Sequence, residues 1–173
     1  MRFPLPLRSL VVVSSLSLTL LGADARAESV LLTCPGTQAT HYTPGLTFTP
    51  RLIHFTSSTV AGPCVGLPLT VTSLRSSLAG QGTLDCLAGS ADVVLEIEWS
   101  DGTSSHAEGS NVLTLRPGGV VVVVEQSTVV SGRFLGATLT RTVTLLQTEL
   151  LACATEEGVT DVAGPVTYTV TGL

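Results

Sequence analysis

The sequence has no lysine and few aromatic residues, and both shortages limit what the chain can do. Its 173 residues carry 8 basic side chains, all arginine, against 13 carboxylates, for a formal net charge of −5. Binding of nucleic acid requires clustered Lys and Arg that neutralise phosphates. The arginines here are scattered, so a nucleic-acid partner is excluded, and adhesion to anionic membranes is excluded for the same reason. Five arginines follow the predicted signal peptide described below, and we expect them to be surface residues with apolar stems: Arg51, Arg75, Arg116, Arg133 and Arg141.

The sequence also lacks an apolar run long enough to cross a membrane. Its N-terminal run, Leu10 to Leu21, is about twelve residues, whereas a spanning helix needs about twenty. Basic residues precede this run and small residues follow it, which is the order of a signal peptide: Arg2, Arg8, Ala23, Ala25 and Ala27. We expect residues 1–27 to be a signal peptide, cleaved after Ala27 or after Ala25. Residues 28–173 are then a single secreted domain without a membrane span, extracellular or, if the source has an outer membrane, periplasmic.

Four cysteines, an even number, fall in the predicted mature domain: Cys34, Cys64, Cys86 and Cys153. An even count in an exported chain predicts two disulfides. No C-x-x-C pair is present, so we expect no zinc site. Three pairings are compatible with the sequence. We favour Cys64–Cys86, which joins neighbouring elements, and Cys34–Cys153, which ties the start of the domain to its end.

Threonine and valine supply 43 of the 146 residues from 28 to 173, and both are typical of strands. Apolar residues alternate with polar ones from Val93 to Ser100, around a row of threonines from Thr138 to Thr144, and from Val166 to Thr171. Asp101-Gly102 predicts a tight hairpin turn. The five valines from Val120 to Val124 predict a central strand that is covered on both sides. Further strands are expected at residues 30–34, 51–58, 69–73, 83–87 and 111–115.

This pattern predicts an all-β fold: one antiparallel β-sandwich, an immunoglobulin-like Greek key of roughly 8–9 strands, stapled by two disulfides. A closed barrel is the alternative, because the number of strands does not separate the two architectures.

Several turns and framework residues together carry a resemblance: residues 42–47 (YTPGLT), 62–64 (GPC), 98–103 (EWSDGT), 131–136 (SGRFLG) and 150–153 (LLAC). Over nearly the whole mature chain, the sequence resembles an uncharacterised family of small secreted actinobacterial proteins. The resemblance implies secretion and a β-sandwich fold. It implies no catalytic or binding residue, because the shared features are turns, cysteines and a tryptophan.

Residues able to do chemistry are few. The histidines are His41, His54 and His106, and the densest acidic patch is formed by Glu96 and Glu98 with Asp101 and Glu108 nearby. No G-x-S-x-G elbow is present, and the carboxylates do not follow the spacing of a calcium loop. We therefore expect no catalytic residue, no cofactor and no metal site, and hence no enzyme.

The sequence is best interpreted as a secreted, non-enzymatic module that works through its surface, as an extracellular interaction or envelope-associated protein. Its partner would be a protein or a surface glycan. The first alternative is a small extracellular hydrolase, which would place His41 or His106 in a concave pocket beside a carboxylate and a serine. The second is a carbohydrate-binding or small-ligand domain, which would expose Phe134 or Tyr42 in a groove. Trp99 shares its face with Val93, Leu95 and Ile97 and is expected in the core.

Overall fold

The computed structural model describes residues 30–115, 121–145 and 151–172, without the side chains of residues 111–115, 121 and 145. The predicted signal peptide lies outside these ranges. Within them the chain forms nine strands and the 3-10 helix η3 (Ala152–Ala154). The strands are β1 (Val30–Leu46), β2 (Arg51–Ala61), β3 (Val65–Gly66), β4 (Leu74–Leu84), β5 (Gly89–Trp99), β6 (Ser104–Leu115), β7 (Val121–Gly132), β8 (Thr138–Leu145) and β9 (Val159–Thr171). No helix among the described residues is long and apolar enough to cross a membrane.

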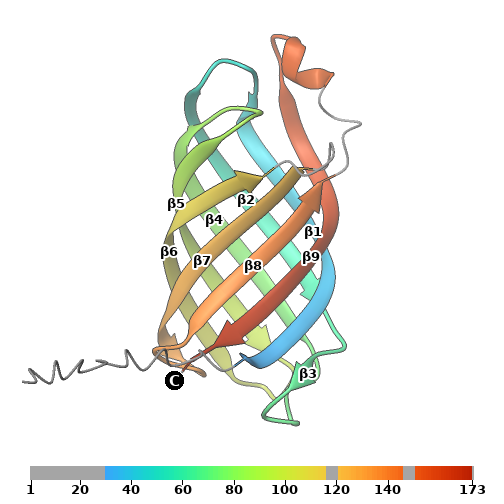
Figure 1. The fold of residues 1–173 in the computed structure, drawn as a ribbon, viewed down its shortest axis with the longest axis vertical. Coiled ribbons are helices and arrows are strands. Elements are labelled where there is room, and N and C mark those ends of the chain that lie inside the picture. The colour runs from blue at the N-terminus through green and yellow to red at the C-terminus, as the bar shows by residue number, and fades with distance from the viewer. Residues whose placement is uncertain (1–29, 116–120, 146–150, 173) are drawn as a thin grey trace, which may run out of the picture.

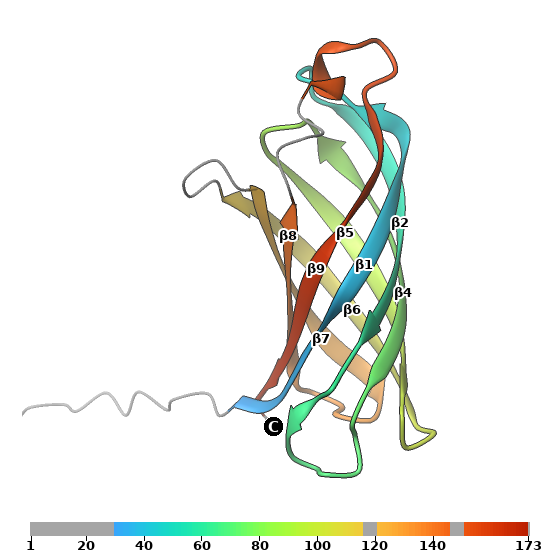
Figure 2. The same cartoon turned by 90° about the vertical axis from the view of Figure 1, so that its right-hand side faces the viewer.

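Eight of these strands form a closed antiparallel barrel (Figures 1 and 2). The sheet runs in the order β2-β4-β5-β6-β7-β8-β9-β1, and β1 closes it by pairing with both β9 and β2. The two-residue strand β3 adds only a short pairing to β1. The predicted β-sandwich is therefore wrong. The strands follow one another up and down around the barrel, so the Greek-key order is wrong as well.

Glycines let neighbouring strands of the barrel approach closely at two places. A Cβ added at Gly36 would lie 2.3 Å from the Val60 carbonyl oxygen, and one at Gly82 would lie 2.1 Å from that of Ser90. Only glycine allows this approach, and glycine kinks of this kind give a sheet the curvature that closure requires. Alternation of polar and apolar residues is common to sandwiches and barrels. The sandwich prediction failed because alternation within a strand does not show whether the two edge strands of a sheet pair with each other.

The end of the barrel near β3 is filled by a tight apolar core. Trp99, Leu95 and Leu32 are at most 3% exposed, and the Trp99 indole nitrogen donates a hydrogen bond of 2.8 Å to the Ser105 hydroxyl. The predicted core position of Trp99 is thus confirmed. The run of valines is less buried than predicted, because Val122 and Val124 face outward and are partly exposed; Val120 lies outside the described residues.

Both predicted disulfides form, but the favoured pairs are wrong. Cys34 bonds to Cys64 at the β3 end, with a Cα–Cα distance of 4.1 Å. Cys86 bonds to Cys153 at the opposite end, with a Cα–Cα distance of 6.2 Å. Cys64 and Cys86 lie beyond opposite ends of β4, and eleven extended residues span about 36 Å. A disulfide tolerates no more than about 7 Å between Cα atoms, so Cys64 cannot bond to Cys86.

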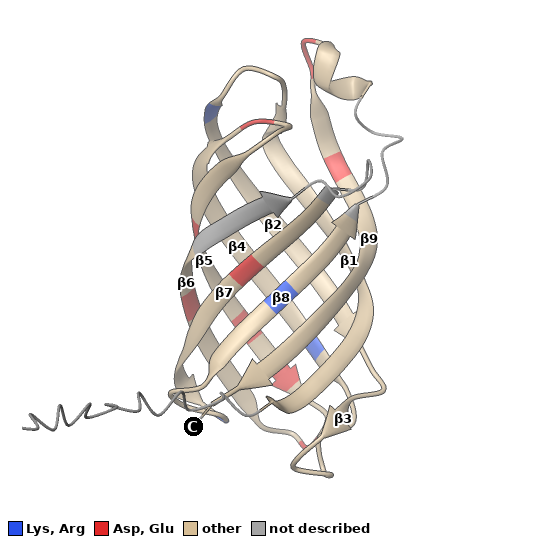
Figure 3. Ribbon diagram, viewed as in Figure 1, with Lys and Arg blue, Asp and Glu red and all other residues tan. Residues whose placement is uncertain are grey.

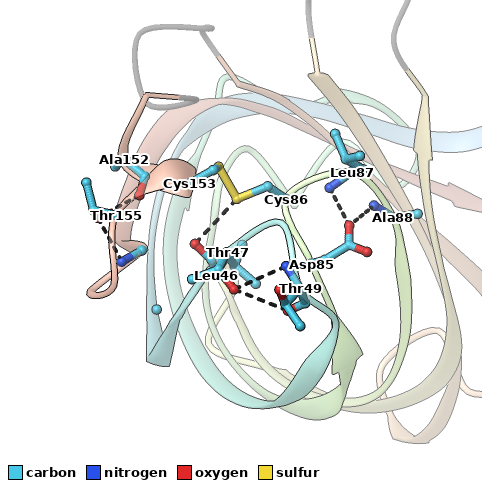
Figure 4. Close-up of a disulfide and its surroundings, with 12 residues drawn as sticks. Leu46, Thr47, Thr49, Asp85, Cys86, Leu87, Ala88, Ala152, Cys153 and Thr155 are labelled. Carbon is cyan, nitrogen blue, oxygen red and sulfur yellow. Dashed lines mark hydrogen bonds between the residues drawn. A yellow bond between two sulfur atoms is a disulfide. The ribbon is translucent and has the colours of Figure 1, made fainter.

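The Cys86–Cys153 disulfide fastens the loop between β4 and β5 to helix η3, beside the end of β1 (Figure 4). The Cys86 amide donates a hydrogen bond of 2.9 Å to the Thr47 carbonyl, and the Asp85 carboxylate accepts bonds from the Leu87 and Ala88 amides. Two predicted strands differ from the structure. Residues 69–73 form no strand, and of residues 83–87 only Thr83 and Leu84 are in a strand, at the end of β4.

Candidate functional site

A shallow groove crosses the outer face of five adjacent strands, β9, β1, β2, β4 and β5. It consists of two adjoining hollows of about 490 and 780 Å³. We call it the lateral groove. Its outward-facing residues are Ala39, His41, Thr43, His54, Thr56, Ser58, Ser77, Ala79, Gln81, Asp92, Val94, Glu96, Asp161 and Ala163.

Strand register explains why short side chains form the floor of this groove. Ala39 on β1 lies between Ala163 on β9 and Ser58 on β2. Farther along the same row, Ser77 on β4 faces Glu96 on β5. Longer side chains flank this floor: Glu96 ends the row on β5, and His41 and Asp161 stand in the adjacent row on β1 and β9. The groove combines side chains from five separate strands, so no local sequence motif predicts it.

His41 stands at the β9 end of the groove and is paired with Asp161. Its Nδ1 atom donates a hydrogen bond of 2.8 Å to the Asp161 carboxylate, and both side chains are more than half exposed. The hydrogen bond from His41 lowers the pKa of Asp161, with a smaller contribution from Thr160. No hydrogen bond joins His41 to a serine among the interactions of the described residues. The geometry gives a histidine–carboxylate pair at the β9 end of the groove.

His106 forms a second histidine–carboxylate cluster at the β5 end of the groove. Its Nδ1 atom lies 2.5 Å from Glu96 Oε1, and its Nε2 atom lies 3.4 Å from Glu108 Oε1. The hydrogen bond to Glu96 is the main cause that raises the pKa of His106, and Glu108 adds to it. Both ring nitrogens therefore point at carboxylates, which favours the protonated, doubly donating form.

The acidic patch predicted from sequence is divided in the structure. Glu96 and Glu108 flank His106, whereas Glu98 lies opposite Arg75 in register. Asp101 sits in the predicted hairpin turn, where the Thr103 hydroxyl and the Arg133 guanidinium bond to its carboxylate. These contacts, the Thr103 hydroxyl first, lower the pKa of Asp101. Across the described ranges no group of three His, Cys, Asp or Glu residues has the geometry to hold a metal ion.

Neither aromatic residue considered for glycan binding lies in the lateral groove. Phe134 stacks edge-on against Trp99 with ring centroids 5.1 Å apart, and the Arg133 guanidinium lies over its ring. Tyr42 faces the interior, 5.7 Å from the ring of Phe55. His54 lies on the outer face of β2 and lines the groove.

The strands β8 and β9 carry few charged residues (Figure 3), and their sequences are rich in threonine. Thr138, Thr140 and Thr142 lie directly opposite Thr171, Thr169 and Thr167. Glu125 on β7 and Arg141 on β8 belong to this side of the barrel, but their side chains are buried inside it. The exposed carboxylates of the described strands are concentrated on and beside the lateral groove instead.

Sequence analysis missed a buried polar cluster inside the barrel. Arg141 is only 5% exposed, and its guanidinium bonds to Glu125, Gln38 and Ser57. The expectation that Arg141 is a surface residue is therefore wrong. The one available signal was the alternation along β8, which places Arg141 on the same inward side as Leu139 and Val143.

Comparison with known proteins found no matching family model, no similar curated protein and no similar solved structure.

Proposed function

We propose that this protein is a secreted, non-enzymatic binding module that recognises an extended, positively charged segment of another protein across the lateral groove. The observation that carries the proposal is the composition of the groove. Its lining residues include three carboxylates, Asp92, Glu96 and Asp161, and no arginine. A surface of one charge sign is complementary to a partner of the opposite sign and accelerates its association.

The shape of the lateral groove fits an extended chain. Five adjacent strands at about 4.8 Å spacing give it a length of about 19 Å, which corresponds to about six residues of an extended peptide. Its floor of alanine, serine and threonine lets a backbone approach closely, and the Ser58 and Ser77 hydroxyls offer hydrogen bonds along it. Val94, 42% exposed between Asp92 and Glu96, supplies an apolar contact at the β5 end.

The groove favours a peptide over a glycan because it has no aromatic platform. Phe55 is the sole aromatic among the described residues that line it. Its ring packs inside the barrel against Tyr42 and over Gly80, where an added Cβ would lie 2.4 Å from the ring. Sugar recognition that relies on stacking therefore has no surface here.

The test uses a fluorescent peptide of alternating arginine and threonine and a matched peptide with glutamate in place of arginine, followed by anisotropy. We expect the arginine peptide to bind, to bind more weakly as salt increases, and the glutamate peptide not to bind. Asp92→Asn and Glu96→Gln should each weaken binding by up to about fivefold. Glu98→Gln, outward on the same strand but outside the groove, is the control.

Equal binding of the two peptides would overturn the proposal. A loss with Glu98→Gln as large as that with Glu96→Gln would also overturn it, because the effect would then be one of net charge and not of the groove.

One observation favours a second candidate, the small hydrolase: the His41–Asp161 pair does lie in a groove. If the binding proposal is correct, the wild-type protein should hydrolyse p-nitrophenyl acetate and a casein substrate no faster than the His41→Gln variant does. Turnover that disappears in His41→Gln and persists in His54→Gln would make the hydrolase the better interpretation.

A further inference from the structure

The connection between β2 and β4 exposes three large apolar side chains at one end of the barrel. We call this connection, residues 62–73, the β3 loop. Val65, Leu67 and Leu69 are 72%, 64% and 81% exposed, and the loop contains no charged residue. Figures 1 and 2 show that it projects beyond the ends of the strands. Single exposed apolar residues are normal on protein surfaces, but a group of them marks an interaction site.

The β3 loop is fixed in this exposed position. The Cys34–Cys64 disulfide ties its start to β1, and the Leu67 amide donates a hydrogen bond of 2.7 Å to the Leu31 carbonyl. Near its end, Val71 is only 2% exposed and belongs to the core. The three exposed side chains cannot fold back onto the barrel without breaking these contacts.

The β3 end has no net charge among its described residues, whereas the rest of the described chain is acidic. Its charged residues are two arginines and two carboxylates. Arg133 Nη1 lies 2.9 Å from Asp101 Oδ2, and Arg75 lies opposite Glu98 in register. The other described charged residues are two arginines and eight carboxylates. Charge complementarity therefore favours a partner surface without net charge at the β3 end.

The chain that precedes β1 connects the β3 end to a segment directed at a membrane. β1 begins with Val30 at this end, where Leu32 pairs with Gly66. Two residues separate Val30 from the predicted cleavage site after Ala27, and four separate it from the site after Ala25. Four extended residues span about 14 Å. The predicted signal peptide carries the apolar run that enters the membrane during export, so the β3 end is the end of the domain nearest to that membrane.

We propose that the β3 loop docks the secreted protein onto a lipid bilayer without net charge. Val65, Leu67 and Leu69 lie at the boundary between the head groups and the acyl chains, and the barrel stands with its β3 end on the surface. The lateral groove, on the side of the barrel, then stays open to its own partner. Burial of three aliphatic side chains gives weak, reversible binding. Because apolar burial and not charge attraction causes the binding, salt does not weaken it.

The test is cosedimentation of the oxidised, secreted protein with phosphatidylcholine vesicles at low and at high salt. We expect equal binding at both salt concentrations, and no tighter binding when the vesicles contain phosphatidylglycerol. Leu69→Gln should weaken binding about tenfold, because it removes a large apolar side chain from the contact. Leu151→Gln is the matched control: Leu151 is 85% exposed at the opposite end of the barrel, and its replacement should leave binding unchanged.

A second measurement locates the loop in the bilayer. Leu69→Trp and Leu151→Trp each add one tryptophan to the buried Trp99, and brominated phosphatidylcholine quenches a tryptophan only at the depth of the acyl chains. We expect quenching of the added fluorescence in Leu69→Trp and none in Leu151→Trp.

Three results would each show that the proposal is wrong. The first is no cosedimentation with phosphatidylcholine vesicles, and a protein partner would then be the better interpretation of the β3 loop. The second is an equal loss of binding in Leu69→Gln and Leu151→Gln. The third is quenching in Leu151→Trp that equals or exceeds that in Leu69→Trp.

Discussion

Arg141 illustrates how one buried charge determines the surroundings of several polar groups. Its guanidinium contacts Glu125, Gln38 and Ser57 inside the barrel. Burial raises the pKa of Glu125, and the nearby Arg141 counteracts that effect. A buried ion pair of this kind contributes little by itself, but loss of one partner leaves the other charge uncompensated.

We therefore predict that Arg141→Met lowers the free energy of unfolding by about 3–5 kcal/mol at neutral pH, measured by urea denaturation. The loss should shrink as the pH falls. Without Arg141, the pKa of Glu125 in the folded protein lies still further above its ordinary value of 4.5. The variant is therefore most stable when Glu125 is protonated, and it loses this stability as the pH rises through the pKa of the folded state. The double variant Arg141→Met, Glu125→Leu should recover most of the loss. No recovery would contradict this account of the pair.

His106 provides a prediction about pH at the outer surface. Because Glu96 and Glu108 raise its pKa above the ordinary value of 6.5, the folded state binds the proton more tightly than the unfolded state does. The resulting stability is complete below the unfolded pKa and is lost as pH rises through the folded pKa. NMR titration of the imidazole should show a pKa above 6.5 that falls in Glu96→Gln and stays unchanged in Glu98→Gln. A pKa that does not respond to Glu96→Gln would refute the pairing.

At the scale of elements, the two disulfides hold opposite ends of the barrel. Cys34–Cys64 closes a segment of 30 residues and Cys86–Cys153 one of 67. Chain entropy assigns them about 3.6 and about 4.4 kcal/mol. We predict that paired Cys→Ser replacement at 86 and 153 lowers the urea midpoint more than the same replacement at 34 and 64. Mass spectrometry of non-reduced proteolytic fragments checks the pairing itself, and a Cys64–Cys86 fragment would contradict the fold.

Several elements could be predicted from the sequence because their signals are local. Alternation from Val93 to Trp99 correctly marks β5 and places Trp99 inside, and Asp101-Gly102 marks the turn before β6. Closure could not be predicted in the same way. It depends on pairing between β1 and β9, whose partners His41 and Asp161 are 120 residues apart. The same distance hides the candidate site, since every row of the lateral groove combines side chains from separate strands.

The cysteines show what a known topology would have added. In an up-and-down barrel, successive connections alternate between the two ends. Cys64 and Cys86 fall in connections separated by one long strand, so they belong to opposite ends. Sequence spacing alone suggests the reverse, because it treats neighbours in the chain as neighbours in space.

At the scale of the whole molecule, charge and shape divide the barrel into two sides. Where β8 pairs with residues 166–171 of β9, the outer face presents opposed threonines, and none of the described side chains there is both charged and exposed. The side of the lateral groove combines a hollow floor with carboxylates and two histidine–carboxylate contacts. This asymmetry is the basis for locating recognition on the groove side.

The most direct test is NMR mapping of the amide signals of the oxidised protein during titration with the arginine–threonine peptide. The proposed function predicts shifts confined to the outer face of β9, β1, β2, β4 and β5, centred on His41, Ser58, Ala79 and Glu96, with the β8 threonines unchanged. Shifts centred on the threonine face, or no shifts at peptide concentrations that saturate anisotropy binding, would contradict it.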